Sequence, residues 1–369
     1  MNCFRGARAT VVLSIAASLV LAACQRPEKA PETATASETD AAKLAEIALA
    51  SPTMARVKAR GRLNCGVHEG LMGFAYTDNR GNWRGFDVDF CRATAAAVLG
   101  NPDAVNFVPL PSGERFSAVS EGRVDVLWRN SSWTMTRDAT GELTFAGINY
   151  YDGQGFLVRR SLNLSSASEL NGARICVHGN STSELNAEDY FRTREIEYRA
   201  VVLPSEEAAR QSYAREECDA LTGDISSLAA ARSILVDPKQ HVVLPEVISK
   251  EPLGPVVRAG DERWAAVVRW TLNALISAEE LGVTKANVGE FAEKGGSPAI
   301  NRLLGTEGDF GPSLGLSRNW AKDAVAASGN YGEIFDRNIG RSSALDLDRG
   351  LNNQWNAQSG GLIYSLPIR

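Results

Sequence analysis

Apolar and polar residues alternate along the middle of the chain in a way that predicts strands and helices in turn. Residues 63–67 alternate with a period of two, which is typical of a strand. A helical pattern follows, with Asp87 as its expected N-cap and Gly100 closing it. Further strands are expected at residues 105–108 and 124–127, separated by a short helix.

Two glycines, Gly153 and Gly155, then suit a crossover, after which the alternation begins again. The expected strands of this second series are residues 173–177, 199–203 and 218–221, and Ser205 is the expected cap of one of its helices. Strands that alternate with helices form mostly parallel sheets with helices on both faces. The pattern therefore predicts an α/β fold with two units, each with its own core.

The last third of the chain is predicted to be helical. Residues 262–279 form an amphipathic pattern after Asp261, and the chain beyond Gly295 carries several glycines and scattered aromatic residues. These aromatic residues include Trp320, Tyr331, Phe335 and Trp355. We expect a helical extension that packs on the first unit, with docking to a partner protein as the alternative role.

The N-terminus has the pattern of an export signal. Arg5 and Arg8 precede an apolar run over residues 11–23, which is too short to span a bilayer. The run ends Leu-Ala-Ala-Cys24, which resembles the bacterial lipobox, so lipidation of Cys24 is expected; an ordinary signal peptide cut near Ala23 is the alternative. Residues 24–54, poor in large apolar side chains, are predicted to be a flexible tether.

Charge and cysteine usage narrow the function classes. The formal net charge is −5 and no basic stripe is visible, which argues against a nucleic-acid partner. Four cysteines remain after the signal segment and Cys24, an even number that favours two disulfides in an exported chain. Three pairings are possible, and we expect Cys65 with Cys91 and Cys176 with Cys218, because each pair lies within one unit. Zinc is the alternative, but no two of these cysteines form a CxxC pair.

The stretch WRNSSWTMTR, residues 128–137, predicts a site for a small carboxylate. It follows an apolar strand and sets out Asn130, Ser131 and Ser132 before Arg137. The planar guanidinium of Arg137 fits a carboxylate with two parallel hydrogen bonds. A solvated surface arginine is the alternative interpretation.

The second series of strands and helices also carries polar residues that could bind charged groups of a ligand. Ser181 and Thr182 lie at the expected start of a helix, where hydroxyls suit an anion. Asp224 follows a strand and a glycine and is placed for a cation, although an aspartate there can also serve as a turn or cap residue.

The order of motifs resembles the extracellular solute-binding proteins of polar amino-acid ABC transporters. The matching stretches are GNWRGFDVD (81–89), RFSAVSEGRVD (115–125), WTMTR (133–137), YYDGQGF (150–156) and CDALTGD (218–224). GNYGEIFDRNIG and LNNQWN near the C-terminus are similar to the general L-amino-acid-binding subgroup. The resemblance implies the type II periplasmic-binding-protein fold, with a first lobe over 55–155, a second lobe over 156–251, and a return to the first lobe with the extension over 252–369.

The resemblance also implies roles for individual residues. Arg137 matches the arginine that holds the α-carboxylate, and Asp224 matches the acid that takes the α-ammonium. Asn130 and Ser132 match polar positions that bind the amino-acid backbone, and Thr182 matches a second-lobe hydroxyl that assists the carboxylate. His68, Glu69 and Leu71 are expected on the pocket wall, where Leu71 replaces an aromatic residue that often stacks on the ligand; this favours broad specificity.

The expected function is that of a non-enzymatic, monomeric binding protein without cofactor or metal. It would capture free L-amino acids in the periplasm, anchored through lipidated Cys24, and deliver them to the membrane permease subunits of an ABC transporter. The main alternative is an exported dehydratase on the same fold that acts on a cyclic carboxylate, for which His68, His178 and Glu69 are the only acid–base candidates near the cleft. A receptor's ligand-sensing domain is a further alternative, disfavoured because no apolar run long enough to cross a membrane follows the body.

Overall fold

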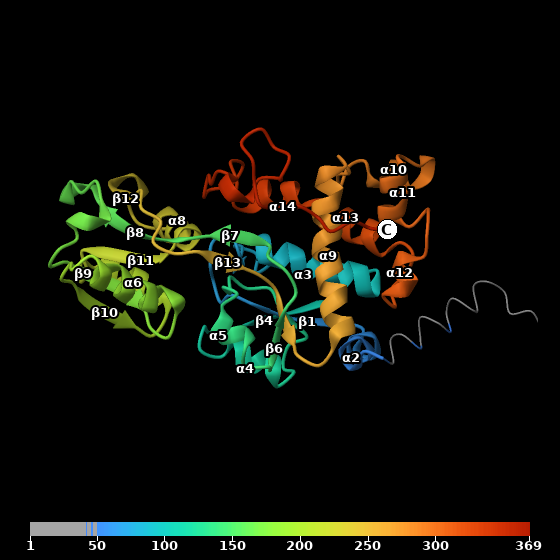
Figure 1. The fold of residues 1–369 in the computed structure, drawn as a ribbon, viewed down its shortest axis with the longest axis horizontal. Coiled ribbons are helices and arrows are strands. Elements are labelled where there is room, and N and C mark those ends of the chain that lie inside the picture. Colours follow the sequence, from blue (N-terminus) through green and yellow to red (C-terminus); the bar gives the residue numbers. More distant parts are fainter. Residues whose placement is uncertain (1–41, 43–45, 47–49) are drawn as a thin grey trace, which may run out of the picture.

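The computed structural model describes residues 42, 46 and 50–369, and it contains two five-stranded sheets side by side (Figure 1). We call the first sheet with its helices the first lobe, and the second sheet with its helices the second lobe. The expected signal peptide, the lipidation site at Cys24 and most of the predicted tether lie outside the described residues. No helix within the described ranges is long and apolar enough to cross a membrane.

The first lobe contains the sheet with strand order β4-β1-β5-β14-β6. Its strands are β1 (Leu63–Val67), β4 (Val105–Pro109), β5 (Val126–Leu127), β6 (Leu143–Phe145) and β14 (Val256–Arg258). Its helices before the crossover are α2 (Pro52–Arg60), α3 (Phe86–Leu99), α4 (Arg115–Ser120) and α5 (Met135–Asp138), and a small hairpin joins β2 (Tyr76–Thr77) to β3 (Trp83–Arg84). Strands β4, β1 and β5 pair in parallel, and β14 runs against both of its neighbours.

The second lobe repeats this plan with strand order β10-β9-β11-β8-β12. Its strands are β8 (Gln154–Arg159), β9 (Arg174–His178), β10 (Arg199–Leu203), β11 (Ala220–Asp224) and β12 (His241–Val243), and its helices are α6 (Thr182–Thr193), α7 (Glu206–Ala214) and α8 (Ile225–Ser233). Short 3-10 turns cover Arg160–Leu162, Ala167–Glu169 and Pro238–Gln240. Here β10, β9 and β11 are parallel and β8 is the reversed strand. The predicted α/β class with mostly parallel sheets is confirmed.

Two crossover strands connect the lobes. Strands β7 (Tyr150–Asp152) and β13 (Glu251–Leu253) pair antiparallel between the two sheets (Figure 1). Each leads directly into the reversed strand of the lobe it enters, β7 into β8 and β13 into β14. The chain therefore crosses between the lobes twice through one narrow ribbon.

Most expected strands are confirmed, but the start of α3 differs from the prediction. Gly85 holds the N-cap position with φ 129°, and a Cβ there would lie 2.1 Å from the carbonyl oxygen of Phe74. Asp87 lies inside the helix, is buried, and makes no capping bond. The prediction that Asp87 caps this helix was wrong because the close approach of Gly85 to Phe74 fixes where the helix begins.

The C-terminal third packs on the first lobe, as expected. It comprises α9 (Glu262–Glu280), α10 (Val288–Lys294), α11 (Pro298–Leu304), α12 (Phe310–Ser313), α13 (Trp320–Ser328), α14 (Tyr331–Asn338) and a 3-10 turn at Gly350–Asn352. Tyr331 and Phe335 are buried with Phe86 from α3, at ring distances of 5.9 and 6.3 Å. Trp320 is also buried, but Trp355 is 59% exposed, so packing does not explain that residue.

One buried carboxylate holds helix α2 against α9. Asp261, which caps α9 as predicted, accepts hydrogen bonds from the Ser51 hydroxyl at 3.0 Å and the Thr53 backbone N–H at 2.8 Å. Ser51 in turn caps α2. Ser51 and helix α2 are therefore held against α9, and the last residues of the tether expected over 24–54 belong to this helix.

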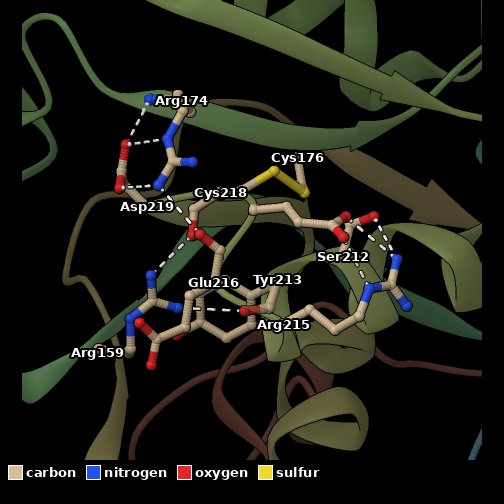
Figure 2. The surroundings of a disulfide bond; sticks show 10 residues. Arg159, Arg174, Cys176, Ser212, Tyr213, Arg215, Glu216, Cys218 and Asp219 are labelled. Atoms are coloured by element: carbon tan, nitrogen blue, oxygen red, sulfur yellow. Dashed lines mark hydrogen bonds and ion pairs between the residues drawn. A yellow bond between two sulfur atoms is a disulfide. The ribbon is translucent and has the colours of Figure 1, made fainter.

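Both expected disulfides are confirmed, Cys65–Cys91 in the first lobe and Cys176–Cys218 in the second. All four cysteines considered for zinc are thereby occupied. Figure 2 shows the second disulfide, where Arg159 donates to the carbonyl oxygens of Tyr213 and Cys218 at 3.1 and 2.8 Å. Arg174 donates to the Asp219 carboxylate at 2.8 Å beside it. The disulfide and these arginine contacts fix the segment that leads into β11.

Candidate ligand-binding site

A cavity that is partly open to solvent lies between the lobes. Its polar residues follow the carboxyl ends of the parallel strands of both sheets, which is where open α/β sheets bind ligands. The predicted residues that line it are His68, Leu71, Asn130, Ser132, Arg137, Ser181, Thr182 and Asp224. Ser131 and Glu69 are not among the lining residues.

Arg137 lies in the short helix α5 and is anchored by its own segment. Its Nη1 donates to the backbone oxygen of Ser132 at 2.7 Å, and its guanidinium carbon lies 5.0 Å from the centroid of the Phe116 ring. Burial lowers the pKa of Arg137, while the nearby carboxylates of Glu251 and Asp224 oppose that shift. The fixed guanidinium keeps further donors for a ligand anion.

The three polar residues before Arg137 have different environments. Asn130 is 9% exposed, and its buried Oδ1 has no hydrogen-bond partner among the described residues. Ser131 is fully buried and its backbone oxygen accepts from the Gly254 N–H at 3.1 Å, so it holds this loop against the crossover. Ser132 donates its hydroxyl to the Glu251 carboxylate. Ser131 Oγ is likewise buried without a partner among the described residues, but of the two residues only Asn130 lines the cavity, so its Oδ1 is the acceptor open to a ligand.

Glu251, at the start of the crossover strand β13, collects hydroxyl and amide donors from both lobes. Besides Ser132 of the first lobe, it accepts from Thr182 Oγ1 at 3.2 Å and Asn186 Nδ2 at 2.7 Å of the second. Ser249 adds a bond at 2.8 Å. In this structure the hydroxyls of Ser132 and Thr182 thus bind a protein carboxylate.

Ser181 occupies the N-cap of α6. Its hydroxyl accepts from the Glu184 N–H at 3.2 Å and donates to the His178 carbonyl at 2.6 Å. Both hydrogen bonds of this hydroxyl stabilise the local fold, and the residue also lines the cavity.

Asp224 is the buried acid that faces the cavity from the second lobe. It ends β11 and occupies the N-cap position of α8, yet its side chain makes no capping hydrogen bond. Burial, together with the nearby carboxylates of Asp152 and Glu251, raises the pKa of Asp224 well above its ordinary value, and Arg137 opposes this shift. Asp152 is held by the backbone N–H groups of Gly153 and Ser226. A cation beside Asp224 would favour its ionised form.

Two polar contacts join the lobes across the cavity. His68 Nε2 of the first lobe lies 3.5 Å from Glu206 Oε2 of the second, and Asn130 Nδ2 lies 3.5 Å from Ser227 Oγ. Burial lowers the pKa of His68. Burial also opposes ionisation of Glu206, but His68 and Arg129 outweigh it and hold the pKa of this carboxyl below its ordinary range. The nearby histidine and arginine therefore favour the ionised form of Glu206, although its Oε2 makes no hydrogen bond within the described residues.

The remaining predicted wall residues divide between the cavity and the surface. Leu71 is buried and lines the cavity together with Met72, giving that wall an apolar character. Glu69 is exposed and lies outside the lining. His178 lines the cavity at the end of β9, and burial lowers its pKa.

Sequence reasoning missed several charged residues of the cavity, namely Arg115, Arg129 and Glu206. Each lies shortly after a parallel strand, as the predicted residues do: Arg115 after β4, Arg129 after β5 and Glu206 after β10. Their position after strand ends was the available signal. Among the described residues no cluster of three or more histidine, cysteine or acidic side chains is arranged to hold a metal ion.

The geometry suits a small zwitterion. Arg137 from the first lobe and Asp224 from the second line the same cavity and influence each other electrostatically, and no ion pair joins them in the described part of the chain. A ligand that carries both charges can occupy the space between them and complete both interactions.

Comparison with known proteins agrees with this geometry. The profile of bacterial extracellular solute-binding proteins, family 3, matches residues 63–287. The chain is 51% identical to the glutamate/glutamine/aspartate/asparagine-binding protein BztA of Rhodobacter capsulatus, over 87% of this chain and 95% of that protein. It is 49% identical to the general L-amino acid-binding periplasmic protein AapJ of Rhizobium johnstonii, over 87% of this chain and 94% of that protein.

A solved structure gives the same result. An ABC transporter periplasmic binding protein from Brucella ovis with glutathione bound matches with a TM-score of 0.83 at 53% identity, covering 86% of this chain and 99% of that chain. The chain therefore belongs to the bacterial extracellular solute-binding proteins, family 3.

Proposed function

We propose that the protein captures free L-amino acids between its lobes and delivers them to the permease of an ABC importer. The observation that carries this proposal is the placement of Arg137 and Asp224, one from each lobe, in one cavity without an ion pair between them. Arg137 would bind the α-carboxylate and Asp224 the α-ammonium, with Asn130 donating or accepting between them. The names of the close relatives, which include amino-acid binding, support the ligand class.

Capture would proceed by closure of the lobes about the crossover strands β7 and β13. A zwitterion that touches both lobes binds the closed form more tightly than the open form, so its binding shifts the equilibrium toward closure. The contacts of His68 with Glu206 and of Asn130 with Ser227 already join the lobes and would act in the same direction. Ser132 and Thr182 would support closure through Glu251.

Location and partners follow from the relatives and the N-terminal sequence. Relatives of this family include periplasmic binding proteins, and the sequence Leu-Ala-Ala-Cys24 supports a lipid anchor at Cys24. The tether after Cys24 would allow the lobes to reach the permease from the membrane surface. We infer that the protein acts as a monomer with no cofactor and no catalytic step.

A thermal-shift screen against the twenty amino acids tests this function. A ligand present at one hundred times its dissociation constant stabilises the native state by about 2.7 kcal/mol, which raises the melting temperature by several degrees. We expect more than one amino acid to do so, because Arg137 and Asp224 engage the zwitterionic group that all amino acids share and the wall at Leu71 and Met72 is apolar. No shift with any amino acid, together with steady turnover of a cyclic carboxylate such as prephenate, would favour the dehydratase alternative.

A further inference from the structure

Two buried arginines, Arg115 and Arg129, lie in the cavity in addition to Arg137. Their exposed fractions are 5% and 3%, and both line the cavity. Arg115 begins α4, and its Nη1 donates to the Ser112 carbonyl at 2.8 Å. Arg129 follows β5 and donates to the Leu110 carbonyl at 3.2 Å and the Ser112 hydroxyl at 2.7 Å. All of these acceptors are neutral.

Several carboxylates act on Arg115 and Arg129 through space, but none contacts either guanidinium within the described chain. No carboxylate there forms an ion pair with Arg115 or Arg129, and the buried Nε of Arg115 has no acceptor at all. Glu206 and Asp87 act on Arg129 only through space, and the close contact of Glu206 is with His68. Burying a guanidinium without an anion costs free energy, so an anion bound beside these arginines would offset that cost.

The two arginines are placed to serve a second group of the same ligand. The guanidinium carbons of Arg115 and Arg137 lie 4.6 and 5.0 Å from the centroid of the same Phe116 ring. Arg129 is joined to this group through Ser112, which accepts from Arg115 at its carbonyl and from Arg129 at its hydroxyl, and all three arginines line the cavity. Asp224 remains for the ammonium group, because the close contact of Glu206 is with His68, at 3.5 Å, and the Asp224 side chain makes no capping hydrogen bond.

We propose that Arg115 and Arg129 form a subsite for a second carboxylate, so that the protein prefers L-amino acids or γ-glutamyl peptides that carry one. This inference rests on the proposed function and specifies its substrate class. Acidic amino acids and γ-glutamyl peptides share the same chemistry. Each has a zwitterionic end that suits Arg137 and Asp224, and each carries a second carboxylate further along the molecule. The cavity is partly open to solvent, so a longer ligand can extend beyond the space that a single amino acid fills.

Calorimetry with the unmodified protein provides the first test, using L-glutamate, L-aspartate, glutathione, L-glutamine, L-alanine and L-lysine. A charge-assisted hydrogen bond is stronger than a neutral one. We therefore expect the dissociation constant for glutamate to be about tenfold lower than that for its isostere glutamine. Tight binding of glutathione with weak binding of glutamate would support the subsite and assign it to the longer ligand.

Equal affinities for glutamate, glutamine and alanine, with no stronger binding of glutathione, would overturn the proposal while leaving the proposed function intact. Failure of every amino acid and of glutathione to bind would overturn both. The two conclusions are therefore distinguishable in one series of titrations.

Variants of Arg115 provide the second test. We expect Arg115→Gln to reduce the preference for glutamate over glutamine about tenfold, while L-alanine binding changes less than about threefold. Arg123→Gln is the matched control, because it removes an equal charge from the same lobe at the surface, where Arg123 pairs with Glu121 at 3.0 Å. Arg115→Lys keeps the charge and should retain most of the preference. An unchanged preference in a folded Arg115→Gln variant would overturn the assignment. If that variant does not fold, the titrations of the unmodified protein decide the question: a clear preference for glutamate over glutamine, or for glutathione, supports the subsite, and equal affinities overturn it.

Discussion

Asp224→Asn tests the ammonium side of the site, and its effect can be worked out from the surroundings of this carboxyl. Asp224 is 9% exposed, and its side chain has no capping bond to lose. Asparagine keeps the shape but leaves the ligand ammonium without an anion. Removing one member of a buried charge pair costs about 2–5 kcal/mol. The dissociation constant for an L-amino acid should therefore rise about thirtyfold or more.

The pH dependence makes this prediction specific. Burial and the carboxylates of Asp152 and Glu251 raise the pKa of Asp224 in the free protein, whereas a bound ammonium lowers it again. Binding should thus release protons, and affinity should increase as the pH rises through the raised pKa of the free protein. The affinity difference between the native protein and Asp224→Asn should be larger at pH 8 than at pH 5.

Isothermal titration calorimetry in two buffers of different ionisation enthalpy measures both effects. The native protein should show a buffer-dependent binding enthalpy, and Asp224→Asn should show less of it. If Asp224→Asn binds with unchanged affinity and unchanged proton release, the ammonium does not bind at Asp224 and the reasoning is refuted.

Two further predictions concern the stability of the fold. Replacing Cys176 and Cys218 with alanine removes a disulfide that joins residues 42 apart in the sequence. The chain entropy of a loop of this length predicts that the free energy of unfolding falls by about 4 kcal/mol. Urea denaturation measures this change, and a loss below about 1 kcal/mol would contradict the prediction. Burial raises the pKa of Asp87 from 3.8 to about 7, despite the opposing effects of Arg129, Asn149 and Asn130. The native state therefore binds a proton more tightly than the unfolded chain does, and stability is lost as the pH rises from about 4 to about 7, by up to about 1.4 kcal/mol per pH unit. Asp87→Asn should flatten the melting-temperature profile in this window, and parallel profiles for the two proteins would show that Asp87 does not titrate there.

The regular elements were predictable from the sequence because they follow from local periodicity. Residues 199–203 are strand β10 as expected, and Asp261 and Ser205 cap their helices as expected. The start of α3 was not predictable, because Gly85 approaches the backbone of Phe74 through a contact between segments. Trp355 was expected to pack because it is aromatic, but its segment leaves it exposed.

Some residues of the candidate site were likewise predictable from the sequence and others were not. Arg137 and Asp224 were identifiable because each follows a strand within a polar stretch and matches a family position. Glu251 was not, since its four donors come from both lobes and the crossover, at sequence separations from 2 to 119. Arg115 was part of a quoted motif, but its unpaired Nε becomes apparent only when the acceptors around it are known.

The most direct test of the central claim is calorimetric titration of Arg137→Ala with an amino acid that binds the native protein. Met135→Ala is the matched control, because Met135 lies in the same short helix and is 88% exposed. Loss of this half-buried cation should remove about 2–5 kcal/mol of the roughly 8 kcal/mol that micromolar binding requires, so binding should become undetectable at micromolar protein while the circular dichroism stays unchanged. Retained micromolar binding by Arg137→Ala would contradict the claim that a zwitterion is held between Arg137 and Asp224.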